Sequence, residues 1–224
     1  MTQTIIDHIV IGAAELDKAT KQIQSFIKAE FLAGGKHPLM ATHNRLIKLQ
    51  NSLYMEIIAA DPSSLLPQNP KRKNRWFSLD SNATQKRLSR APQPLCWVIA
   101  VNDIEKTSMH CGYNPGRIIK MTRGNFSWKI TVSENGDLPE SGVLPIFIEW
   151  PNGKHPTKTM PKSNISLEKL TLFHPHPSGI KHILSKLNIN GSIEVNLGQP
   201  NLQFSLKTPD NISVVFSENC LAKS

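Results

Sequence analysis

The stretch TIIDHIVIGAAELDKATKQIQSFIKAE, residues 4–30, decides the fold class of this chain. Its first nine residues form an apolar, β-branched run of strand length. In residues 13–30 the apolar positions recur at helical spacing: Leu16, Ala19, Ile23, Phe26 and Ile27. The sequence therefore predicts a strand that leads directly into an amphipathic helix.

This opening belongs to a unit that the chain uses about three times. The first unit, about 5–62, continues with HNRLIKLQN and SLYMEIIAAD as strands. The second, about 95–151, and the third, about 164–218, repeat the order strand, helix and three strands. The pattern predicts an α+β fold of βαβββ modules, because open sheets must pair to cover their apolar faces.

The bulk composition is that of an ordinary globular protein. Of the 224 residues, 39% are hydrophobic and 19% are charged, and no apolar run approaches the ~20 residues that span a bilayer. The N-terminus lacks the pattern of a secretion signal. The cysteines are Cys96, Cys111 and Cys220, an odd number without metal-site spacing, which is typical of a reducing compartment. We therefore expect a cytoplasmic protein without a membrane segment.

The formal net charge of +9 is concentrated in residues 71–90, which carry seven Lys and Arg residues against Asp80. Such a run most often forms a solvated linker, and we assign residues 63–94 as a basic linker between the first two units. Nucleic-acid binding is the disfavoured alternative, since only Trp76 and Phe77 are available for base stacking. A basic rim would also attract an anionic substrate.

Three ionisable residues stand inside apolar strands. His8 shares a strand face with Val10, Glu56 lies within YMEII, and Glu149 lies within IFIEW. A carboxylate at such a position needs water, a donor or a metal. One hypothesis is therefore an open site in which His8, Glu56 and Glu149 bind Mg, Mn, Fe(II) or Zn. The alternative is a core histidine with glutamates that face a wet cleft.

The chain resembles the glyoxalase-like proteins of the vicinal oxygen chelate superfamily. The segments that carry the resemblance are DHIVIGAAELDKA (7–19), GGKHPLMATHNRLIKL (34–49), YMEIIAADP (54–62), RWFSLD (75–80), LPIFIEW (144–150) and HP (155–156). Together they fall within residues 5–160, which we assign as one glyoxalase-like domain.

The resemblance implies paired βαβββ modules that form a half-barrel cleft holding a divalent metal. The ligand positions correspond to His8, Glu56, Cys96 and Glu149, and Cys96 departs from the pattern, so we treat it as a lining residue. The third unit is expected to be a degenerate module without a site, which packs on the barrel or serves dimer formation.

The segment GGKHPLMATHN, residues 34–44, is expected to line the mouth of the cleft in proteins of this kind. We predict substrate contacts for His37, Thr42 and Asn44. Loop residues that cap backbone groups are the alternative. We expect Gly34 and Gly35 to supply a turn with positive φ.

Two functions remain open from the sequence. The favoured one is a metal-dependent lyase or isomerase that acts on a small oxygenated metabolite, with Glu56 or Glu149 as ligand or general base. The other is a metal-free protein that binds a small molecule in a cleft lined by Trp97 and Trp128, beside Trp150. Core packing is the competing role for these tryptophans.

Overall fold

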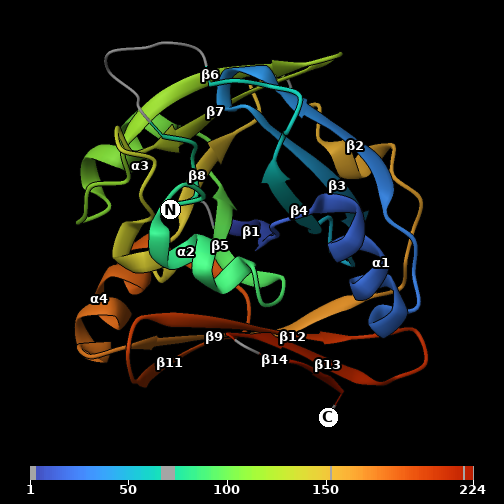
Figure 1. The fold of residues 1–224 in the computed structure, drawn as a ribbon. Helices are drawn as coiled ribbons and strands as arrows, with labels where there is room; N and C mark the ends of the chain where they lie inside the picture. Colours follow the sequence, from blue (N-terminus) through green and yellow to red (C-terminus); the bar gives the residue numbers. More distant parts are fainter. Residues whose placement is uncertain (1–3, 67–73, 152, 219, 224) are drawn as a thin grey trace.

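A computed structural model of the protein describes residues 4–66, 74–151, 153–218 and 220–223. Figure 1 shows two layers, a curled sheet above and a smaller, flatter sheet below, with helices at their sides. The curled sheet has nine strands and the other has five. The predicted α+β class and half-barrel architecture are confirmed.

The curled sheet consists of two βαβββ modules. The first contains β1 (Thr4–Gly12), α1 (Leu16–Ile27), β2 (Leu32–His37), the 3-10 turn η1 (Pro38–Met40), β3 (Thr42–Lys48) and β4 (Tyr54–Ala60). The second contains β5 (Gln93–Ala100), α3 (Ile104–His110), β6 (Arg117–Arg123), β7 (Phe126–Val132), η2 (Pro139–Gly142) and β8 (Ile146–Glu149).

The strand order β2-β3-β4-β1-β5-β8-β7-β6 relates the modules by an approximate two-fold rotation. The two first strands, β1 and β5, pair antiparallel at the centre. Each is flanked by the last strand of its own module, β4 or β8, in parallel. The first and last strands of both modules therefore form the floor of one cleft, as the resemblance implied.

The segment between the modules includes a helix. It contains α2 (Asn82–Leu88), whose N-cap Ser81 accepts a hydrogen bond from the Thr84 amide. Residues 71–73, which hold part of the predicted basic patch, lie outside the described residues.

The third unit has the expected element order but a different pairing. It contains β9 (Ser166–His174), α4 (Pro177–Leu187), β10 (Ile189–Asn190), β11 (Ile193–Leu197), β12 (Asn201–Lys207), β13 (Ser213–Ser217) and β14 (Cys220–Lys223), and η3 (Pro156–Lys158) precedes it. Its order is β11-β9-β12-β13-β14, so β9 pairs with β11 and β12. In the two modules the first strand pairs instead with the last.

Two hydrophobic cores follow from the alternation of side chains along the strands. On the convex face, Ile9, Trp97 and Phe147 pack against α1 and against the inner face of the five-stranded sheet. On the concave face, Val10 and Ile148 belong to a second core. The third unit therefore covers the back of the half-barrel and leaves its concave side to the cleft.

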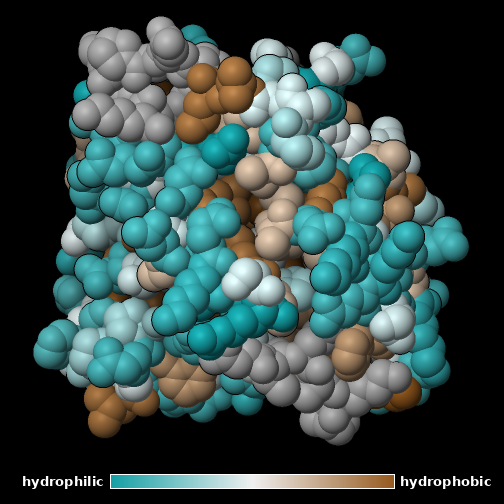
Figure 2. All heavy atoms as spheres, viewed as in Figure 1, coloured by the Kyte–Doolittle hydropathy of each residue, from teal (hydrophilic) through white to brown (hydrophobic). Residues whose placement is uncertain are grey.

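The face of the molecule shown in Figure 2 is mostly hydrophilic, with hydrophobic side chains visible only in small areas. Among the described residues, no helix has the length and apolar character that crossing a membrane requires.

Candidate functional site

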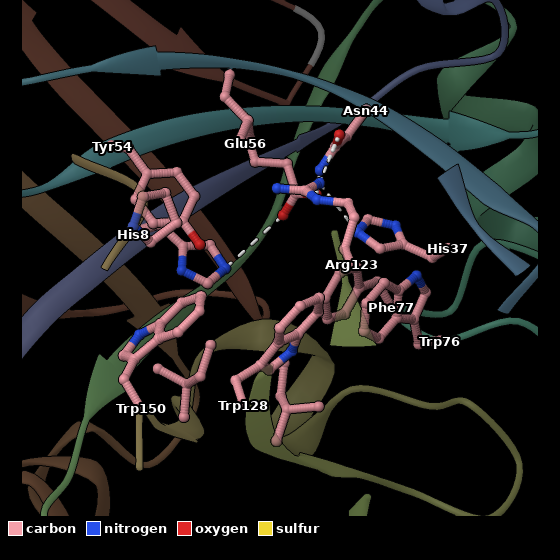
Figure 3. Close-up of a pocket in the computed structure, with 14 residues that line it drawn as sticks. His8, His37, Asn44, Tyr54, Glu56, Trp76, Phe77, Arg123, Trp128 and Trp150 are labelled. Carbon is pink, nitrogen blue, oxygen red and sulfur yellow. Dashed lines mark hydrogen bonds and ion pairs between the residues drawn. The ribbon is translucent and has the colours of Figure 1, made fainter. Parts of the chain in front are cut away.

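A narrow pocket of about 370 Å³, including the space that opens to solvent, lies on the concave face. The first module contributes mainly polar side chains to its wall: His8, His37, Asn44, Tyr54 and Glu56. The second module contributes Arg123 and four mainly apolar side chains, those of Trp128, Ile130, Ile148 and Trp150. Figure 3 shows these side chains converging from opposite sides. The two halves of the pocket therefore differ in chemistry despite their related folds.

A β-bulge brings Asp7 and His8 to the same side of β1. The pairing of β1 with β5 shifts register between Ile6 and His8, so Asp7 is the extra residue. The Asp7 carboxylate lies 2.7 Å from His8 Nδ1. This contact at the ring edge fixes the orientation of the imidazole. One face of the imidazole stacks on Tyr54, with ring centroids 4.4 Å apart. His8 therefore presents Nε2 to the pocket.

Asp7 is buried and contacts both a pocket residue and the segment that follows β8. Its Oδ2 accepts a hydrogen bond from Trp150 Nε1 at 2.9 Å and lies 3.1 Å from His155 Nε2. Burial alone would raise the pKa of Asp7, but the contacts with His155 and His8 outweigh it and hold this pKa well below its usual range. Asp7 is therefore an anion that positions His8.

Glu56 lies in the middle of β4 with 6% of its side chain exposed. Asn44 on the neighbouring strand donates from Nδ2 to Glu56 Oε1 at 2.6 Å. The other oxygen, Oε2, is 3.7 Å from His8 Nε2, which is beyond hydrogen-bond distance. One carboxylate oxygen is thus anchored, and the other faces His8 across a gap.

His37 belongs to a buried chain of polar contacts behind the pocket. Its Nδ1 lies 3.2 Å from Thr42 Oγ1, which also accepts a hydrogen bond from Trp76 Nε1 at 3.2 Å. Burial, reinforced by the positive charge of Arg123, lowers the pKa of His37 to about 3. His37 is therefore neutral, and its Nε2 faces Arg123 Nη1 at 3.5 Å. Thr42 lies behind the wall and supports His37.

Glu149 lies outside this cluster, which corrects the expectation that it joins His8 and Glu56. Its Oε2 accepts a hydrogen bond from the Ile104 amide at the start of α3, at 2.9 Å, and its Oε1 pairs with Lys129 at 3.0 Å. Side chains alternate along β8, so Ile148 faces the pocket and Glu149 does not.

Trp97 also lies on the convex side, where it is fully buried and donates from Nε1 to the Val143 carbonyl at 3.0 Å. The expectation that it contacts substrate is corrected by the same alternation. Cys96 does face the concave core, and burial raises the pKa of its thiol well above the usual value. Trp128 lines the pocket as expected.

Several pocket residues were not singled out from the sequence. Trp76 and Phe77 come from the segment assigned as a linker, are almost fully buried and close one side of the pocket. The feature of the sequence that could have identified them as pocket residues is that they form an aromatic pair within a charged stretch. Nothing in the sequence identified Arg123 as a pocket residue, because it ends an ordinary amphipathic strand.

The donor set at this site does not fit a tightly held divalent ion. Only His8 Nε2 and Glu56 Oε2 converge with free lone pairs, and no group of three His, Cys, Asp or Glu side chains within the described ranges could hold a metal. Catalytic zinc sites use three protein ligands. Cys96 adds no ligand to this pair, because it is not among the residues that line the pocket.

Comparison with known proteins places the chain in a family. The glyoxalase-like domain family matches residues 6–188, and the chain belongs to that family. Its fold is that of the vicinal oxygen chelate superfamily. No curated protein matches the chain.

Among solved structures, a hypothetical protein from Staphylococcus aureus is similar over 99% of this chain and 98% of its own, with a TM-score of 0.64 and 17% identity. This likeness covers the whole fold, including the third unit. Methylmalonyl-CoA epimerase, in a complex with methylmalonyl-CoA and NH4+, aligns with 69% of this chain and all of its own, with a TM-score of 0.46 and 14% identity. The epimerase from Mycobacterium tuberculosis covers 64% of this chain and 85% of its own, with a TM-score of 0.42 and 13% identity.

Proposed function

We propose that this protein is an enzyme of the isomerase or lyase type, which acts on a small oxygenated metabolite by a metal-independent route with Glu56 as the proton acceptor. The observation that carries the proposal is how the two oxygens of the Glu56 carboxylate are placed. Asn44 holds one oxygen, and the other faces His8 across 3.7 Å inside a pocket. A general base needs such a fixed position with one oxygen free to receive a proton.

The gap between Glu56 Oε2 and His8 Nε2 suits a reaction at a carbon next to a carbonyl. Glu56 would take the proton from that carbon, and the electron pair of the C–H bond would move to the carbonyl oxygen. His8, whose Nδ1 faces the Asp7 carboxylate, would donate from Nε2–H to the developing oxyanion when its imidazole carries a proton on both nitrogens. Return of the proton to another face or another atom gives an isomer, and departure of a neighbouring group gives a lyase product.

The pocket dimensions support a small substrate. The pocket is narrow, because its empty space of about 370 Å³ includes the part that opens to solvent, so only a small molecule fits between its walls. Trp128 and Trp150 provide flat apolar walls, with ring centroids 5.6 Å apart. These walls would exclude water from the reacting carbon.

A second candidate is a binding protein that uses the same pocket without turnover. The aromatic walls favour it, because Trp76, Phe77, Trp128 and Trp150 can hold a ligand without any proton transfer. The two candidates differ in one respect: only the enzyme needs Glu56 as a base.

Solvent exchange tests the proposal. Small 2-oxo and 3-oxo acids are incubated with the protein in D₂O, and loss of the C–H signal next to the carbonyl is followed by NMR. We expect exchange with the wild type and none with Glu56→Gln, which keeps the shape of the side chain but cannot accept the proton. Binding without exchange would support the binding protein. Exchange that stops on addition of EDTA would contradict the metal-independent route.

A further inference from the structure

Arg123 lies in the pocket wall without a carboxylate partner. It ends β6, directly before the turn into β7. No Asp or Glu among the described residues lies within ion-pair distance of its guanidinium. Three other half-buried arginines do have such partners: Arg45 with Asp17, Arg75 with Asp80 and Arg87 with Glu218. A half-buried cation without an anion needs another explanation.

The neutral contacts of Arg123 hold it by one nitrogen only. Nη1 donates to Asn44 Oδ1 at 3.2 Å and lies 3.5 Å from the neutral His37 Nε2. Within the described part of the chain, Nε and Nη2 donate no hydrogen bond to a protein acceptor. These two nitrogens form the edge of a guanidinium that binds a carboxylate through two parallel hydrogen bonds.

Arg123 stands at the neck between the pocket and an outer hollow. The outer hollow, about 780 Å³, is bounded by β2, the β6–β7 turn and the segment after His155. Leu46, Arg123 and Pro156 line both spaces. The chain also leaves room for this side chain, because a Cβ on Gly35 would lie 2.6 Å from Arg123 Cδ. A molecule that enters from the hollow must pass the guanidinium.

Asn44 connects this cation to the base. Its amide oxygen accepts from Arg123 and from the Gly35 amide, and its amide nitrogen donates to Glu56. Figure 3 shows Arg123, Asn44 and Glu56 directed toward one another. A group bound at Arg123 is therefore separated from Glu56 by the length of one small side chain.

We propose that Arg123 binds the carboxylate of the substrate at the neck of the pocket, while the C–H carbon next to the substrate carbonyl reaches Glu56. The substrate class is thus a small carboxylic acid with a carbonyl next to the reacting carbon, and this step rests on the proposed function. A phosphate suits the site less well. No lysine lines either space, and the Glu56 carboxylate would oppose a second negative charge.

Direct binding tests this assignment without turnover. The probes are pyruvate and three longer 2-oxo acids, their neutral methyl esters and inorganic phosphate, titrated at constant ionic strength while the fluorescence of the pocket tryptophans is followed. We expect millimolar binding of at least one acid, and binding of its ester about 10- to 100-fold weaker. Arg123→Gln should lose that preference, and Arg123→Lys should keep part of it.

Lys120→Gln is the matched control, because Lys120 lies exposed on the same strand and the change removes the same charge. It should bind the acids as the wild type does. Unchanged acid binding by Arg123→Gln, acid and ester of equal affinity, tighter binding of phosphate than of every acid, or no binding of any acid to the wild type would each overturn the assignment. Melting temperatures confirm that the variants are folded.

The outcome is separable from that of the proposed reaction. Glu56→Gln should still bind the acid, since the carboxylate is held by Arg123 and not by Glu56. Loss of binding in Arg123→Gln together with unchanged exchange in Glu56→Gln would retain the anion site and remove the proposed base.

Discussion

His37 is held in its neutral form, and this form allows its contact with Arg123. It is almost fully buried, and burial together with the charge of Arg123 lowers its pKa to about 3. A protonated imidazole would repel the guanidinium that faces its Nε2 at 3.5 Å. The neutral form instead accepts from Arg123 and so helps to orient it.

The lowered pKa predicts a specific pH dependence of stability. In the unfolded chain His37 regains a pKa near 6.5, so the unfolded state binds the proton first as the pH falls. The contribution to the free energy of unfolding therefore decreases from about pH 6.5 down to about pH 3, by at most about 1.4 kcal/mol per pH unit. Urea unfolding of the wild type and of His37→Gln at pH 7, 6, 5 and 4 measures the difference.

We expect the wild type to lose more stability than His37→Gln between pH 6 and pH 4. His182→Gln, at an exposed position of α4, serves as the control and should follow the wild type. Parallel curves for the wild type and His37→Gln would show that His37 is not held neutral by the fold.

The sequence predicted the residues of the first module better than those of the second. His8, Glu56, His37 and Asn44 stood out because polar side chains inside apolar strands or beside glycines are unusual. Arg123 could not be recognised in this way, since an arginine at a strand end is ordinary. Its role depends on the approach of β6 to β2, which the curl of the whole sheet determines.

At the scale of elements, the pair Gly34 and Gly35 in β2 is required by space and not by turn geometry. The expectation of positive φ is wrong, because neither residue is among the glycines with positive φ. Instead, a Cβ on Gly34 would lie 2.1 Å from the Asn44 carbonyl oxygen and 2.2 Å from Asn44 Oδ1. The missing side chains let β2 approach the Asn44 side chain that holds Glu56.

Gly34→Ala should therefore disturb both stability and the site. We expect a loss of about 1–3 kcal/mol in the free energy of unfolding, since the clash is with backbone and cannot be relieved by a rotamer change. Gly179→Ala in α4 is the control, because nothing lies within 4 Å of the new Cβ. It should be neutral or stabilising by up to about 1 kcal/mol. Equal stability of the two variants in urea unfolding would contradict the steric explanation.

The periodicity of the sequence could not determine which face of β8 is directed to the cleft. The run LPIFIEW is apolar on both faces, so it did not reveal which residues face the cleft. The pairing of Ala100 with Ile148 fixes the answer, and Glu149 falls on the other face. A strand buried on both sides needs its neighbours to define its orientation.

At the scale of the whole molecule, the third unit acts as a cover for the convex face. Leu202, Phe204 and Leu206 of β12 belong to the same core as Trp97 and Phe147. The expectation that this unit packs on the barrel agrees with these contacts. Its own strand pairing could not be foreseen, because the order of elements is the same for both topologies.

Phe204→Ala tests this role. Phe204 is fully buried between the sheets, so its truncation should cost about 3–5 kcal/mol of unfolding free energy. Phe173→Ala is the comparison, because Phe173 is half-buried on the adjacent strand β9 and alternation places it on the other face of the same sheet. It should cost clearly less, as measured by urea unfolding. Equal losses would mean that the sheet does not pack on the barrel through this face.

The central claim is that Glu56, and not Glu149, is the base of a metal-independent proton transfer. The most direct measurement is the rate at which the protein exchanges the substrate C–H proton with D₂O, compared between the wild type, Glu56→Gln and Glu149→Gln. We predict a loss of at least about 100-fold for Glu56→Gln and a rate near that of the wild type for Glu149→Gln. A wild-type rate in Glu56→Gln, or equal losses in the two variants, would contradict the claim.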